Sequence, residues 1–97
     1  MQWKSKYIVI DTDMGGMLPV VFSEIMSHAN VAAAIKHVGG GEVVGAGFCH
    51  IANTLNDRDL IEPHYVCYGE STSLGIKSRQ EDDAKVLNKM LGVNQGD

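Results

Sequence analysis

The chain has 97 residues, a net charge of -4 at pH 7, 44% hydrophobic residues and 21% charged residues. This length suits one domain over residues 1–97 and is too short for a catalytic domain joined to an accessory one. Nucleic acid and anionic membrane surfaces both attract a cationic footprint, which an acidic chain without a run of Lys or Arg lacks. We therefore expect a single compact domain that binds neither nucleic acid nor membrane.

The N-terminal apolar run predicts a cytoplasmic protein. It follows Lys4 and Lys6 and ends at Asp11, so it is too short for a signal peptide or a membrane span. Structural disulfides are rare in a reducing compartment, so we expect the two cysteines, Cys49 and Cys67, to be free thiols.

The first 22 residues predict a β-hairpin. Residues 6–11 form a β-branched and aromatic run that ends at an aspartate, which is typical of a strand. Residues 14–16, Met-Gly-Gly, supply a turn, and residues 18–22 resume a strand. Pro19 has no amide proton, which places this second strand at an edge or Pro19 at its start.

An alanine-rich segment, residues 28–38, predicts the first helix. Ser27 can cap its start, His37 lies in its last turn, and Gly39 can supply the left-handed residue that ends it. Its apolar stripe is expected to contain Val31, Ala34, Ile35 and Val38.

Residues 42–52 predict a strand whose two faces are both largely apolar or small. Such a strand is typically central and covered on both sides, here by helices on one face and by another subunit on the other. Gly45 and Gly47 share a face, where a helix could approach the backbone closely. We therefore expect a homodimer or higher oligomer. Residues 53–63 are interpreted as a loop and residues 65–70 as the returning strand.

The second helix has the clearest local signals. Ser78 and Glu81 match a capping box, acidic residues precede basic ones, and Gly92 follows the last apolar residue. Its buried stripe is expected to contain Ala84, Leu87, Met90 and Leu91, and residues 93–97 are expected to form a loose tail. The resulting prediction is an α+β fold in the order ββαββα, an antiparallel four-stranded sheet with two helices on one face.

The segment Ile-Asp-Thr-Asp-Met-Gly-Gly, residues 10–16, resembles the start of the inosine-uridine nucleoside hydrolases. The resemblance implies a loop in which aspartates bind calcium and the ribose hydroxyls. Calcium is a hard cation and prefers carboxylate oxygens as ligands. Met17 and Leu18 stand where that family has further aspartates. We interpret Asp11 and Asp13 as solvated residues at a hairpin turn. The alternative is a minimal metal-dependent hydrolase that uses these two carboxylates.

Two further chemistries are considered and not favoured. The four histidines and two cysteines lack the short spacings of dedicated zinc sites, and the adjacent Cys49 and His50 point to opposite faces of a strand. A thiol nucleophile would need a base within hydrogen-bond reach, with His50 or His64 as candidates. We expect no metal, no cofactor and no catalytic residue.

Residues 69–79 predict the best place for a small anion. This segment leaves a strand, carries hydroxyl and basic side chains, and opens a helix whose amide dipoles favour negative charge. The candidate ligand-binding residues are Ser71, Thr72, Ser73, Lys77, Ser78 and Arg79. The alternative is a hydroxyl-rich loop in which Ser78 caps the helix.

Several short segments together are similar to a family of small uncharacterised proteins of bacteriophages and mobile elements. They are residues 21–24 with His28 and Ala32, residues 44–48, 67–71 and 73–76, Ser78 with Arg79, and Glu81 with Asp82. The resemblance implies an accessory protein in a bacterial cytoplasm and supplies no catalytic residues. The leading hypothesis is a small non-catalytic binding protein that recognises a host protein or a nucleotide-like anion.

Overall fold

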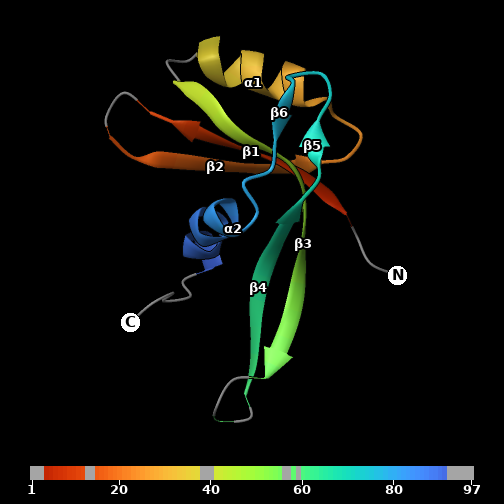
Figure 1. Cartoon of the computed structure of the whole chain (residues 1–97), viewed down its shortest axis with the longest axis vertical. Helices are drawn as coiled ribbons and strands as arrows, with labels where there is room; N and C mark the ends of the chain where they lie inside the picture. Colours follow the sequence, from red (N-terminus) through yellow and green to blue (C-terminus); the bar gives the residue numbers. More distant parts are fainter. Residues whose placement is uncertain (1–3, 13–14, 38–40, 56–57, 59, 92–97) are drawn as a thin grey trace.

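The computed structural model describes residues 4–12, 15–37, 41–55, 58 and 60–91. The elements are β1 (Ser5–Asp11), β2 (Met17–Ser23), α1 (His28–His37), β3 (Glu42–Leu55), β4 (Ile61–Tyr68), β5 (Glu70–Ser71), β6 (Ile76–Lys77), α2 (Glu81–Asn88) and a 3₁₀ turn (Lys89–Leu91). Four strands form an antiparallel sheet in the order β2-β1-β3-β4 (Figure 1). The α+β class and the four-stranded sheet are confirmed. The element order differs from ββαββα, because β5 and β6 form a small additional hairpin.

The N-terminal hairpin is confirmed. The Thr12 amide donates to the Gly16 carbonyl over 2.9 Å, and the Gly15 amide donates to the Thr12 carbonyl over 3.1 Å. Gly15 has a φ of 86°, in the left-handed region that favours glycine. β2 is an edge strand of the sheet, which is one of the two positions expected for Pro19.

The interior strand β1 contributes core residues to both faces of the sheet. Tyr7 and Val9 pack in one cluster with Leu87 of α2. Ile8 and Ile10 pack in a second cluster with Val31 of α1. The two helices therefore cover opposite faces of the sheet, and the predicted arrangement with both on one face is not what the chain adopts. An interior strand that is apolar on both sides needs cover on both sides.

The segment of β3 from residue 43 to residue 49 is covered by the same chain on both faces. Gly45 lies under α2, as the glycine pattern predicted, while Ala46 packs in the cluster with α1 and Ile76 of β6. A second subunit is therefore not needed to cover this part of the strand. The reason given from the sequence for an oligomer does not hold here.

The sequence suggested a loop at residues 53–63, but the structure places parts of two strands in this range. β3 continues to Leu55 and β4 begins at Ile61, so the two strands form a long hairpin that extends away from both helices (Figure 1). We call residues 51–55 and 61–65 the arm. The register pairs Leu55 with Ile61 and Ile51 with Tyr65. The residues at its far end are mostly polar, so their composition indicated a loop, although they pair as strands in the structure.

Helix α1 begins as predicted. Ser27 Oγ accepts the Asn30 amide over 3.1 Å, which is an N-cap contact. Its stripe differs at one position, because Ala32 packs in the core whereas Ala34 is exposed. Val38 and Gly39 lie outside the described residues. In the described part of the chain, neither helix has the length and apolar character that a membrane crossing requires.

Candidate functional site

The opening aspartate motif lies at a hairpin turn. Asp11 ends β1, where it is exposed and pairs in register with Met17 and Glu42. Asp13 lies outside the described residues. Within the described ranges, no three His, Cys, Asp or Glu residues lie close enough together to hold a metal ion. The hydrolase alternative therefore stays a prediction without structural support.

The structure does not bring all six predicted anion-binding residues together at the surface. Some are exposed, and the others make hydrogen bonds within the protein. Ser71 is buried, and its Oγ accepts the Leu74 amide over 3.2 Å. Thr72, Ser73 and Lys77 are exposed. Ser78 and Arg79 belong to a separate hydrogen-bond network described below. Anion binding at this loop stays a prediction, and the exposed residues are the ones that could reach a ligand.

A buried carboxylate, Asp83, is the centre of the network. Its side chain is 0% exposed, and Oδ1 accepts from Arg79 Nε and Nη2, both over 2.8 Å. Oδ2 accepts the Arg79 amide over 2.9 Å. The Tyr7 hydroxyl lies 2.6 Å from Oδ2 and also 2.6 Å from Ser78 Oγ. The network joins the first strand to the last helix.

The protons in this network can be assigned from its chemistry. A carboxylate only accepts, and a phenol has one proton, so Tyr7 donates to Asp83 and Ser78 donates to Tyr7. Burial and the hydrogen bond to Asp83 raise the pKa of Tyr7 well above its ordinary value. The phenol therefore stays protonated, and the arrangement acts as a clamp between strand and helix.

The start of α2 differs from the predicted capping box. The helix begins at Glu81, and the N-cap residue Gln80 makes no side-chain cap hydrogen bond. Ser78 Oγ instead accepts the Gln80 amide over 3.0 Å. The acidic residue that reaches back to the preceding turn is Asp83, through the Arg79 amide. The network thus replaces the predicted cap.

Gly45 completes the site, because the Asp83 carboxylate lies against its backbone. A Cβ at Gly45 would come within 2.6 Å of Asp83 Cγ. Sequence reasoning missed Tyr7, Gly45 and Asp83 as one unit. One signal was available, since Asp83 precedes Leu87 by four residues and so shares its buried helix face. An acidic residue on a buried stripe needs partners.

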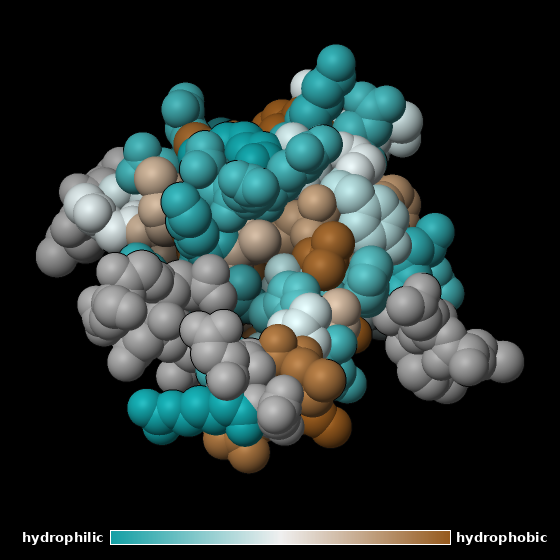
Figure 2. Space-filling model, turned by 60° about the horizontal axis from the view of Figure 1, so that its bottom comes forward, coloured by the Kyte–Doolittle hydropathy of each residue, from teal (hydrophilic) through white to brown (hydrophobic). Residues whose placement is uncertain are grey.

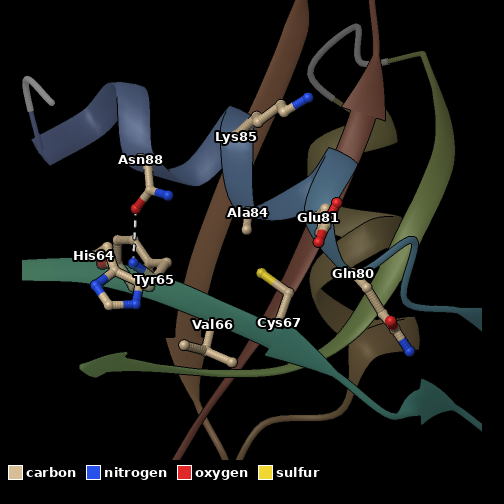
Figure 3. Close-up of a pocket in the computed structure, with 9 residues that line it drawn as sticks. All are labelled: His64, Tyr65, Val66, Cys67, Gln80, Glu81, Ala84, Lys85 and Asn88. Carbon is tan, nitrogen blue, oxygen red and sulfur yellow. Dashed lines mark hydrogen bonds between the residues drawn. The ribbon is translucent and has the colours of Figure 1, made fainter. Parts of the chain in front are cut away.

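A groove of about 570 Å³ lies between α2 and β4. Figure 3 shows the Cys67 sulfur pointing toward Ala84 of α2, while Val66 points away from the helix. The Asn88 side chain spans the groove at one end and accepts the Tyr65 amide over 2.6 Å. Cys67 is thus the side chain at the floor of this groove.

The arm has one apolar face and one polar face. Side chains alternate along a strand, and cross-strand partners share a face. The face on the α2 side contains Ile51, Asn53, Leu55, Ile61, Pro63 and Tyr65, and the opposite face contains Ala52, Thr54, Glu62 and His64. Leu55 is 67% exposed and Ile61 is 69% exposed. Figure 2 is turned so that the end of the molecule that carries the arm faces the viewer, and hydrophobic residues gather in the lower part of this view.

His28 predicts a stability change at mildly acidic pH. Its ring is buried, with Nε2 2.8 Å from the Gly47 carbonyl, and it meets Phe22 and Phe48 edge-on. Burial lowers the pKa of His28, and the charge of Lys6 adds to this, although the Gly47 hydrogen bond opposes it.

Because the folded pKa is below that of the unfolded chain, about 6.5, the unfolded state binds the proton more readily. The stabilisation is therefore complete above that value and is lost as pH falls through the folded pKa. As the pH is lowered from about 6.5, the midpoint temperature of thermal unfolding should fall for the wild type and should change less for His28→Gln. Equal slopes for both proteins would contradict the assignment.

The chain matches no protein-family model, no curated protein and no solved structure, so its site is interpreted from its own geometry.

Proposed function

We propose that the protein is a non-catalytic binding protein that associates with a second copy of itself through the apolar face of the arm. The main support is the alternation described above: one side of a projecting hairpin is apolar, and on that side Ile51 is 49% exposed, Leu55 67% and Ile61 69%. A two-stranded hairpin without a covering layer is only marginally stable in water. A partner on this face would supply that layer.

The edge of the arm is less suited to a partner than its face. The Tyr65 amide on the outer edge of β4 is already bonded to Asn88, and Pro63, two residues earlier, has no amide proton. These features block the addition of another strand at this edge. A partner is therefore expected to stack on the apolar face.

A second copy fits this face for two reasons. The face carries no charged side chain, so a twofold arrangement would bring no like charges together at its centre. The same patch on two subunits is self-complementary in such an arrangement, with two ribbons stacked about 10 Å apart. The face is small, so association is expected to be weak and concentration-dependent.

The test compares two lysine substitutions on neighbouring residues of β3. Leu55→Lys places a charge on the apolar face, and Thr54→Lys places the same charge on the polar face, with both positions exposed. In analytical ultracentrifugation over a concentration series, wild type and Thr54→Lys should rise in average mass above 10.5 kDa. Leu55→Lys should remain a monomer. A wild-type protein that is monomeric throughout, or equal weakening in both variants, would contradict the proposal.

A further inference from the structure

The two cysteines lie directly opposite each other on adjacent strands. The register pairs Cys49 of β3 with Cys67 of β4, and both pack in the same core cluster under α2. Both thiols are free. Cross-strand partners on one face are the closest side chains that a sheet provides.

The hydrogen-bond pattern of the hairpin places this pair at the closer of the two types of site. The Tyr65 amide bonds to Asn88 over 2.6 Å and so points away from β3. Cys67 lies two residues further along β4 and therefore has the same orientation. In such a non-hydrogen-bonded pair the Cα atoms are about 4.5 Å apart, within the range that a disulfide spans, about 4.4–6.8 Å.

Access to the pair is asymmetric. Cys67 is 5% exposed and lies at the floor of the groove between α2 and β4, with its sulfur directed into it (Figure 3). Cys49 is 0% exposed and lies beneath the same helix. A small reagent that enters the groove would therefore meet Cys67 first.

We propose that Cys49 and Cys67 form a redox-active pair, in which Cys67 receives the reagent and Cys49 resolves the product. The oxidant is a low-molecular-weight disulfide such as oxidised glutathione. The Cys67 sulfur attacks one sulfur of this disulfide and forms a mixed disulfide. The S–S bond of the reagent breaks, and the departing glutathione thiolate takes up the proton that Cys67 gave up, so one glutathione thiol is released. The Cys49 sulfur then attacks the Cys67 sulfur, which breaks the mixed disulfide bond and forms the Cys49–Cys67 disulfide. The second glutathione leaves as a thiolate and takes up the Cys49 proton. The protein is oxidised by two electrons, and the reagent is reduced by two.

The surroundings of the pair make the first step slow at neutral pH. Burial raises the pKa of Cys67 to about 12, and the neighbouring Cys49 and Asp83 add to this, although the nearby Tyr7 hydroxyl opposes it. Burial also raises the pKa of Cys49 to about 11. Because the thiolate is the attacking species, the rate should rise about tenfold per pH unit over the range in which the fold is intact.

The test follows folded protein with oxidised glutathione by intact mass spectrometry and peptide mapping after thiol alkylation. Wild type should lose two hydrogen masses, link Cys49 to Cys67, and release two glutathione thiols. Cys49→Ala should instead accumulate a stable glutathione adduct at Cys67. Cys67→Ala should remain unmodified while folded, since Cys49 is buried.

Three outcomes would overturn the proposal. They are a wild-type protein that keeps the adduct as Cys49→Ala does, a folded Cys67→Ala that reacts as fast as wild type, and a wild type that forms the link only in urea. Circular dichroism establishes that each variant is folded. Cys49→Ser serves as a second variant if Cys49→Ala does not fold, and the wild-type peptide map decides the question without any variant.

Discussion

Replacement of Asp83 by alanine is expected to lower the free energy of unfolding by about 3 kcal/mol. The substitution leaves the Tyr7 hydroxyl buried without its acceptor and removes the partner of the Arg79 guanidinium. Loss of one member of a buried ion pair costs about 3–5 kcal/mol when the other charge stays buried. Arg79 is 33% exposed and can be partly solvated, so the lower end of this range applies.

The neighbouring residue Asp82 gives a matched control. It is on the same helix, carries the same carboxylate, and is exposed. Asp82→Ala removes only its favourable interaction with the helix dipole, which is worth about 0.3–1 kcal/mol. Urea denaturation of the three proteins measures the difference. If Asp83→Ala and Asp82→Ala unfold at the same urea concentration, the buried network does not stabilise the fold as argued.

Substitution of Gly45 by alanine is expected to cost about 3 kcal/mol, at the upper end of the range for overpacked cores. The added Cβ would overlap the Asp83 carboxylate. That carboxylate cannot withdraw without breaking its hydrogen bonds to Tyr7 and Arg79. The substitution is therefore expected to break the hydrogen bonds of Asp83 to Tyr7 and Arg79. Thermal and urea unfolding both report it.

Two comparisons separate this clash from a general effect of removing glycine. Gly16→Ala is the control, since its Cβ would meet only Thr12 Oγ1 at 3.9 Å. In an Asp83→Ala background the clash disappears, so Gly45→Ala should cost much less there than in the wild type. Such a double-mutant cycle measures the coupling of the two residues directly. Strictly additive costs would show that Gly45 is constrained by something other than Asp83.

Local signals in the sequence were sufficient for much of the fold. The strand residues 6–11, the turn at residues 15–16 and the N-cap Ser27 were all predicted and are all observed. Each depends on neighbours within a few residues, such as a β-branched run, a glycine in a left-handed turn, or a hydroxyl before a helix. Pro19 indicated either an edge strand or a strand start, and β2 is an edge strand.

Two features that depend on distant residues were not predicted correctly. The capping box at Ser78 failed, because the hydroxyl and the following turn are committed to Tyr7 and Asp83. The loop prediction for residues 53–63 was wrong, because pairing between β3 and β4 continues through polar residues whose local propensity does not indicate a strand. The same pairing determined that the apolar face of the arm forms one surface.

The sequence by itself therefore determined the class of fold, the first hairpin and the approximate positions of both helices, because those features depend on short-range periodicity and capping. Only the tertiary structure decided that the helices cover opposite faces, that Tyr7 meets Asp83, and that Cys49 faces Cys67. Each of these contacts joins residues between 18 and 76 positions apart in the chain, or depends on which face an element covers. Such contacts depend on how distant segments pack against one another, which the signals within a few neighbouring residues do not specify.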